Sequence, residues 1–143
     1  MKWYITAIKD NYFNFSGRAR RKEYWIFVLI NTIFTITAIY LDNILGLNFV
    51  NEKEIFNEII EIEKQYGYIY SLYTLILFIP SLSISFRRLH DTGRSGWYFL
   101  WFLLPLLGIF PVLIAMIKDS IPGENRYGIS PKYLEDNVEK NVE

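Results

Sequence analysis

Three long uncharged stretches divide the chain into apolar and polar segments. They run from Tyr24 to Leu41 (18 residues), from Gln65 to Phe86 (22 residues) and from Ser95 to Ile117 (23 residues). About 20 apolar residues in an α-helix cross the ~30 Å hydrocarbon core of a bilayer. The pattern therefore predicts an all-α membrane protein with three transmembrane helices, over about residues 24–45, 66–86 and 96–117.

A soluble bundle of three buried core helices is the alternative explanation of the same stretches. Helices at the surface of a soluble protein carry polar side chains on one face, whereas the 96–117 stretch has almost none. Tyr and Trp also gather where the stretches begin, for example at Tyr24, Trp25 and Trp97. Amphipathic aromatic side chains favour the headgroup level of a bilayer, so both observations favour the membrane.

The third stretch contains Pro105, Gly108 and Pro111, and such residues interrupt a regular helix. It could therefore turn back at residues 105–108 as a re-entrant hairpin. Half of the stretch reaches only ~17 Å at a rise of 1.5 Å per residue. We therefore expect one kinked span across the whole membrane instead.

Amphipathic patterns flank the spans. Residues 1–15 place apolar side chains at helical spacing and predict an N-terminal interfacial helix on the inner leaflet. Residues 51–67 alternate isoleucines with glutamates and predict a short external amphipathic helix. The charged residues 134–143 predict a disordered polar tail, which leaves 1–133 as a single multi-pass membrane domain.

The net charge of the segments between the spans alternates in sign. It is +4 in residues 1–24, −4 in 42–67, +2 in 87–96 and −2 in 118–143. Short cytoplasmic segments are rich in Lys and Arg, and these number six, two, three and four in the same order. We therefore expect the N-terminus and the 87–96 loop in the cytoplasm, with the 42–67 loop and the C-terminus outside.

Composition excludes several classes of protein. The chain is 52% hydrophobic with a formal net charge of zero, which argues against a disordered chain and against a basic nucleic-acid binder. It has no cysteine, so disulfides, thiolate metal sites and cysteine nucleophiles are excluded. Phosphate-loop, dinucleotide and zinc motifs are also absent from the sequence. We expect no cofactor, no metal and no nucleic-acid partner.

Two basic clusters precede or follow predicted spans on the expected cytoplasmic side. Cations beside a span attract anionic headgroups, at ~1 kcal/mol per side chain. We therefore expect a cationic collar that binds anionic lipids or a partner protein, formed by Arg18, Arg20, Arg21, Lys22, Arg87, Arg88 and Arg94. The residues expected to supply ion pairs, interfacial hydrogen bonds and the turn between spans are Glu23, His90, Asp91, Gly93 and Gly96.

Two other functions remain open from the sequence. A transporter or channel subunit, which would need a homo-oligomer or another membrane protein to enclose a path, is disfavoured because no ionisable residue lies within the three uncharged stretches. A membrane enzyme could use His90 oriented by Asp91 as a general base. However, His90 is the only histidine, and no partner nucleophile is apparent. We expect a protein that is not an enzyme.

The polar segments also carry a family resemblance. Residues 15–25 read FSGRARRKEYW, residues 87–97 read RRLHDTGRSGW, and Gly123, Asn125, Arg126, Tyr127, Gly128 and Pro131 follow at fixed spacing. Together these motifs closely resemble domain-of-unknown-function family 805, over roughly residues 3–131. The resemblance implies a multi-pass bacterial inner-membrane protein with a cytoplasmic N-terminus, and it brings no established activity.

Overall fold

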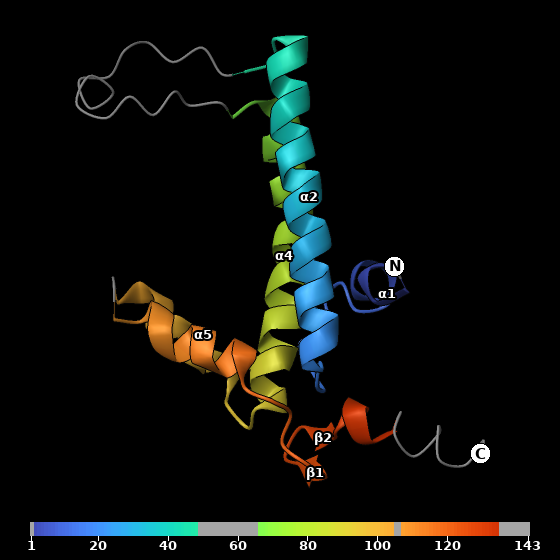
Figure 1. The fold of residues 1–143 in the computed structure, drawn as a ribbon, viewed down its shortest axis with the longest axis vertical. Coiled ribbons are helices and arrows are strands. Elements are labelled where there is room, and N and C mark those ends of the chain that lie inside the picture. The colour runs from blue at the N-terminus through green and yellow to red at the C-terminus, as the bar shows by residue number, and fades with distance from the viewer. Residues whose placement is uncertain (1, 49–65, 105–106, 135–143) are drawn as a thin grey trace. The chain divides into compact units, whose positions relative to one another are not determined.

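The computed structural model describes residues 2–48, 66–104 and 107–134, and these form a mostly helical fold (Figure 1). The chain divides into two compact units, one formed by Met1–Val28 with Ile79–Glu143 and the other by Leu29–Phe78. The elements, in chain order, are helices α1 (Lys2–Lys9), α2 (Arg21–Leu45) and α4 (Tyr68–Asp91), the 3-10 helix η1 (Gly96–Leu103), helix α5 (Ile109–Ile117) and the antiparallel strands β1 (Glu124–Asn125) and β2 (Gly128–Ile129).

Helices α2 and α4 are both long and apolar enough to cross a membrane. They contain 25 and 24 residues, with mean hydropathies of 1.8 and 1.7. At 1.5 Å per residue their lengths are about 37 and 36 Å. Large apolar side chains such as Leu29, Ile36 and Leu75 are exposed on them, an arrangement suited to hydrocarbon. These two candidate spans coincide with the spans predicted over 24–45 and 66–86.

In the unit of residues 29–78, a buried carboxylate joins the end of α2 to the start of α4. Asp42 is fully buried and accepts hydrogen bonds from the backbone amides of Ile69 and Tyr70, at 2.9 and 2.8 Å. These amides belong to the first turn of α4, where backbone donors have no partner within the helix. Further along, Tyr73 Oη donates to Asn31 Oδ1 at 2.7 Å, so polar groups on both helices pair with each other.

The other unit contains two small apolar cores. One core consists of Ala7, Ala19, Phe27 and Ile84, so it packs α1 and the start of α2 against α4. The second consists of Leu89, Val112, Ala115 and Met116, so it packs α5 against the end of α4. Within residues 1–15, where an N-terminal interfacial helix is predicted, the structure has the helix α1 over Lys2–Lys9; its position on a membrane surface stays a prediction.

Residues 96–117 differ from the predicted single kinked span. Their described parts form two short helices, η1 and α5, which contact each other. Gly108 lies so close to the carbonyl group of Trp101 that a Cβ atom would overlap it, and its amide donates to Leu104 O at 3.0 Å. Neither helix is long enough to cross ~30 Å of hydrocarbon. The described residues of this stretch therefore form two short helices in contact instead of one long helix.

Two of the predicted segments lie largely outside the described residues. The expected external amphipathic helix covers residues 51–67, of which only 66 and 67 are described. The expected polar tail covers residues 134–143, of which only 134 is described. Both remain predictions.

Candidate functional site

Asp91, the last residue of α4, is the centre of a buried ionic cluster. Its Oδ1 accepts a hydrogen bond from Arg18 Nε at 2.9 Å, and its Oδ2 accepts one from Arg88 Nη1 at 2.5 Å. Ser120 Oγ also donates to Oδ2, at 2.5 Å. The side chains of both ion pairs have no exposed surface. The two guanidinium groups therefore supply the counter-charge that a carboxylate needs when it is removed from water.

Arg18 uses all five N–H donors of its guanidinium group inside the protein. In addition to its bond to the Asp91 carboxylate, Nη1 donates to the carbonyls of Gly123 and Gly128 at 2.9 and 3.1 Å. Nη2 donates to the carbonyls of Asp91 and Ile121 at 3.3 and 2.6 Å. Since arginine has five donors in a rigid fork, no N–H group of Arg18 is left for an external ligand.

Arg88 lies one turn before Asp91 and is fully buried. Its Nε donates to Met116 O at 3.2 Å, and its Nη2 donates to Lys118 O. Its Nη1 lies 3.4 Å from Ala19 O, to which it also donates. The last carbonyls of a helix have no partner within the helix and favour a cation nearby. Arg88 therefore anchors the end of α5 to α4.

Two other predicted arginines lie beside this cluster. Arg87 is buried, its carbonyl accepts a hydrogen bond from the amide of Ala19 at 3.0 Å, and its guanidinium group attracts Glu23 electrostatically. The Arg94 guanidinium carbon lies 4.8 Å from the ring centre of Tyr98, close enough for a cation–π interaction. The Arg94 guanidinium group thus lies over an aromatic ring, and Arg87 is removed from solvent.

The two predicted turn glycines lie where the chain passes from α4 into η1. Gly93 has a φ of +74°, and the amide of the next residue, Arg94, donates to Leu89 O at 2.9 Å. A glycine in this left-handed conformation ends a helix at little steric cost. Gly96 begins η1 against the ring of Phe86, where a Cβ atom would come within 3.0 Å of it.

His90 does not form a dyad with Asp91. Its Nδ1 lies 3.2 Å from Gly17 O, and its ring stacks on Tyr127 with 3.8 Å between centroids. The carbonyl of His90 accepts a hydrogen bond from Asn125 Nδ2 at 3.0 Å. Since Arg18, Arg88 and Ser120 occupy both oxygens of Asp91, these two neighbouring residues have separate partners.

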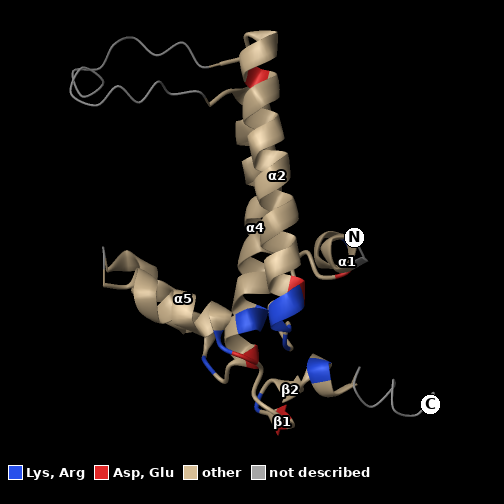
Figure 2. Ribbon diagram, in the orientation of Figure 1, with Lys and Arg blue, Asp and Glu red and all other residues tan. Residues whose placement is uncertain are grey.

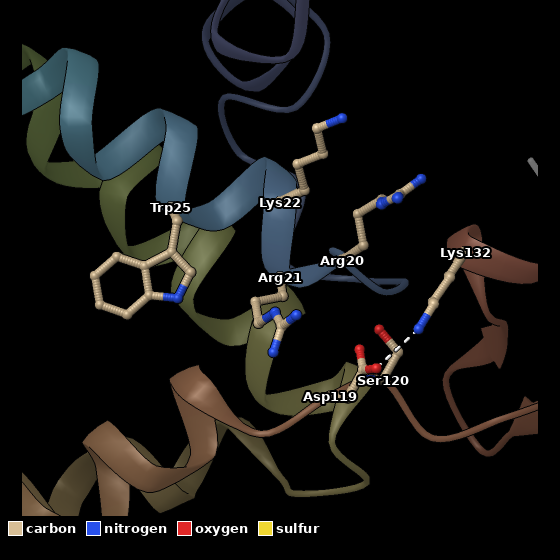
Figure 3. A pocket seen from close by; sticks show the side chains of 7 residues that line it. All are labelled: Arg20, Arg21, Lys22, Trp25, Asp119, Ser120 and Lys132. Atoms are coloured by element: carbon tan, nitrogen blue, oxygen red, sulfur yellow. Dashed lines mark hydrogen bonds and ion pairs between the residues drawn. The ribbon is translucent and has the colours of Figure 1, made fainter.

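The remaining basic residues of the predicted collar line a cavity of about 340 Å³ (Figure 3). Its lining residues come from the start of α2 and from the segment after α5, and they are Arg20, Arg21, Lys22, Trp25, Asp119, Ser120 and Lys132. Arg21 Nη1 lies 3.5 Å from Ile117 O, the last residue of α5. Lys22 Nζ lies 5.0 Å from the centre of the Trp3 ring. We call this cavity the basic pocket.

Asp119 is the carboxylate of the basic pocket, and it is already paired. Lys132 Nζ donates to its Oδ2 at 2.8 Å, and the backbone amide of Ser120 donates to its Oδ1 at 2.9 Å. Both hydrogen bonds lower the pKa of Asp119 below its ordinary value, and the bond from Lys132 has the larger effect. Four cationic side chains and one carboxylate line the pocket, so positive charge is in excess.

The interpretation of the sequence missed Ser120 and Lys132. Both lie after the last apolar stretch, where no helical or strand period connects them to Arg20 or Asp91. Of the twelve residues predicted as a collar or as its supports, the structure puts Arg20, Arg21 and Lys22 in the basic pocket. It puts Arg18, Arg88 and Asp91 in the buried cluster.

Residues 12–129 match the family described as "Protein of unknown function (DUF805)". The chain belongs to this family. Among its relatives, the inner membrane proteins YhaH and YhaI of Escherichia coli K12 are 40% and 41% identical to it over 132 and 133 residues. These alignments cover 92% and 93% of this chain and 98% of each relative. The uncharacterized protein YiiR of the same organism is 27% identical over 164 residues.

No solved structure matches this member of the DUF805 family. Its relatives are named as inner membrane proteins, and helices α2 and α4 are candidate spans. The chain is therefore a bacterial inner-membrane protein, as the sequence motifs implied.

Proposed function

We propose that this protein is a non-enzymatic membrane protein that binds anionic lipid headgroups in the basic pocket. The observation that carries this proposal is the excess of cations in one cavity. Arg20, Arg21, Lys22 and Lys132 line it, while the only acidic residue among its lining residues, Asp119, is bound to Lys132. Phosphate oxygens form short, charge-assisted hydrogen bonds with such cations.

The position of the pocket suits a lipid phosphate. Arg21 is the first residue of α2, which is one of the two candidate spans, so the pocket lies where a transmembrane helix begins. The positive end of the helix dipole favours an anion there. Trp25 lines the same cavity with a 40% exposed side chain, and tryptophan favours the headgroup level of a bilayer.

The predicted collar divides into a supporting part and a binding part. Arg18 and Arg88 direct their donors at Asp91 and at backbone carbonyls, so they hold the surrounding segments in place. Arg21 and Lys22 are exposed at the start of α2 and supply charge to the pocket. Lys132 joins them from the segment after β2.

We place the basic pocket at the cytoplasmic face of the inner membrane. Three of its four cations, Arg20, Arg21 and Lys22, belong to residues 1–24, which hold six Lys and Arg, whereas residues 42–67 hold two. Positively charged segments stay in the cytoplasm during insertion, and the inner leaflet supplies anionic headgroups. Figure 2 shows basic residues at the Arg21 end of α2 and at the Asp91 end of α4.

The two other candidate functions have less support. A general base needs a partner that orients it, and the carboxylate beside His90 is occupied by two arginines. A transport pathway usually contains an intramembrane ionisable group. Asp42 follows the first uncharged stretch, near the end of α2, and its carboxylate caps the first turn of α4, which favours a structural role.

The test compares binding of phosphatidylglycerol and phosphatidylcholine to the purified full chain by native mass spectrometry. The variant Arg21→Gln/Lys22→Gln removes two pocket cations, each worth about 1 kcal/mol near an anionic surface. We expect phosphatidylglycerol binding to weaken by about tenfold or more, with phosphatidylcholine binding unchanged.

The matched control is Lys9→Gln/Lys118→Gln, which removes two exposed cations that do not line the pocket. We expect it to bind phosphatidylglycerol like the parent protein. Equal weakening in both variants would show that total charge attracts the lipid, and the proposal would be wrong. Preferential capture of an acidic protein with unchanged lipid binding would favour a protein partner instead.

A further inference from the structure

Both ends of the 96–117 stretch lie at the same end of α4. At its start, Gly96 lies against the ring of Phe86. At its end, Arg88 donates to the carbonyls of Met116 and Lys118. The chain leaves α4, forms η1 and α5, and returns to the last two turns of α4 (Figure 1).

Neither arm of this hairpin is long enough to cross a bilayer. The eight residues of η1 extend about 16 Å at ~2.0 Å per residue. The nine residues of α5 extend about 14 Å at 1.5 Å per residue. Each arm is therefore about half of the ~30 Å hydrocarbon thickness, which is the depth of one leaflet.

The surface of the two arms is apolar. The side chains of Trp97, Leu103 and Leu107 are 76, 76 and 75% exposed, and Phe110 and Ile114 are 64 and 59% exposed. Residues 95–117 contain no charged side chain, and α5 is free of acidic and basic colour in Figure 2. An apolar surface of this kind marks contact with a membrane or a partner.

Within the arms, backbone polar groups find partners. Leu104 N donates to Trp101 O, and Gly108 N donates to Leu104 O, both at 3.0 Å. Arg88 satisfies the carbonyls of Met116 and Lys118 at the end of α5. Non-spanning backbone enters hydrocarbon only when its polar groups are satisfied in this way.

We infer that η1 and α5 enter the cytoplasmic leaflet and leave it on the same side, with the acyl chains of that leaflet covering their exposed face. The segment after α5 then lies on the same side as the N-terminus, as the bonds from Arg18 to Ile121 and Gly123 require. Thirteen of the fifteen Lys and Arg residues then lie on that side, which agrees better with the positive-inside rule than a third span.

The first arm of the test is topology. Green fluorescent protein or alkaline phosphatase is fused to the C-terminus of the full chain in bacterial cells. We expect fluorescence and no phosphatase activity, because the hairpin keeps the C-terminus in the cytoplasm. Phosphatase activity without fluorescence would show that 96–117 crosses the membrane, and the inference would be overturned.

The second arm of the test identifies what covers the hairpin. The chain has no cysteine, so Leu107→Cys and Ile129→Cys each carry a single fluorescent label in reconstituted vesicles. Lipids brominated along the acyl chain are expected to quench the label at 107, with loss of its emission. The label at 129, which follows α5 and is exposed, is expected to respond only to a quencher in water.

Two results of the labelling would overturn the inference. Quenching of the label at 107 by a water-soluble quencher would put the hairpin in solvent. Protection from both quenchers would mean that protein, such as a second copy of the chain, covers it. Phosphatidylglycerol binding to the basic pocket is measured separately, so failure of the proposed function leaves both readouts of the hairpin unchanged.

Discussion

At the scale of single residues, equal charges have unequal roles. Arg18 and Arg21 are three positions apart and look alike in the sequence. The side chain of Arg18 has no exposed surface and gives all five donors to the protein. Arg21 is exposed and donates a long hydrogen bond of 3.5 Å to Ile117 O. The number of donors used inside the protein separates a structural cation from one that can meet a ligand.

Arg18→Lys tests whether the five donors of Arg18 have a structural role, because it keeps the charge and removes the guanidinium group. An ammonium group has three donors, so at least two of the five acceptors lose their partner. Each unsatisfied buried group costs about 1–3 kcal/mol. We expect the free energy of unfolding to fall by about 2–4 kcal/mol on this basis, measured by thermal unfolding in detergent.

The control for this prediction is Arg21→Lys, at an exposed position. We expect it to change the free energy of unfolding by less than about 0.5 kcal/mol. Equal stability of Arg18→Lys and Arg21→Lys would contradict a structural role for the five donors. Phosphatidylglycerol binding by Arg18→Lys should remain close to that of the parent, since the pocket keeps its charges.

At the scale of the elements, one carboxylate from α2 begins α4. Asp42 accepts hydrogen bonds from Ile69 N and Tyr70 N. Its carboxylate therefore caps the start of α4, although Asp42 belongs to α2. Gly67 lies so close to Asp42 that a Cβ atom would overlap it. The start of α4 therefore depends on a residue 26 positions earlier than its first residue, Tyr68.

Asp42→Ala is expected to loosen the first turn of α4. Loss of a capping carboxylate costs about 0.5–2 kcal/mol, and hydrogen exchange should speed up at the amides of Ile69 and Tyr70. Thr37→Ala is the control, because its exposed hydroxyl donates only to Ile33 O within α2. Unchanged exchange at both amides in Asp42→Ala would contradict the capping role.

At the scale of the whole molecule, the distribution of charge matters more than its sum. The formal net charge is zero, yet the Lys and Arg residues concentrate in residues 1–24 and 87–134. Residues 18, 88 and 91 bring these two segments together through the buried ionic cluster. The basic residues of these two segments therefore also assemble the buried cluster.

We predict that Arg20→Gln/Arg21→Gln/Lys22→Gln keeps the orientation of the parent protein. Lys2, Lys9 and Arg18 remain in the N-terminal segment, and residues 42–67, which we expect outside, still have only two cations. A cysteine at the exposed Ser16 should react with an impermeant maleimide only after the cells are opened. A cysteine at the exposed Leu45 should react in intact cells.

Labelling of the cysteine at Ser16 in intact cells would mean that these three cations set the orientation. In the expected case, the triple variant loses phosphatidylglycerol binding while its orientation is unchanged. The basic residues would then affect lipid binding separately from membrane orientation.

Much of the fold could be predicted from the sequence because hydrophobic length is a local property. The stretches around α2 and α4 lack charge over a length that fits a bilayer, and the structure has long helices there. The motifs at residues 15–25 and 87–97 predicted membership of the family, which the match over residues 12–129 confirms.

The path of residues 96–117 could not be settled in the same way. A kinked span and a hairpin have the same apolar composition, and Pro105 and Gly108 are compatible with both. A kinked span and a hairpin differ in which residues contact the two ends of the stretch. Arg88 contacts the carbonyls of Met116 and Lys118, and sequence periodicity does not encode a contact over this distance.

By itself, the sequence determined the membrane location, the family and the two long apolar helices, because each depends on composition over a continuous stretch. Only the tertiary structure decided which cations are buried against Asp91 and which line the basic pocket. It also decided that η1 and α5 are two short helices in contact with each other. Burial and hydrogen-bond partners come from segments about 30 to 110 residues apart, so they exist only after the chain has folded.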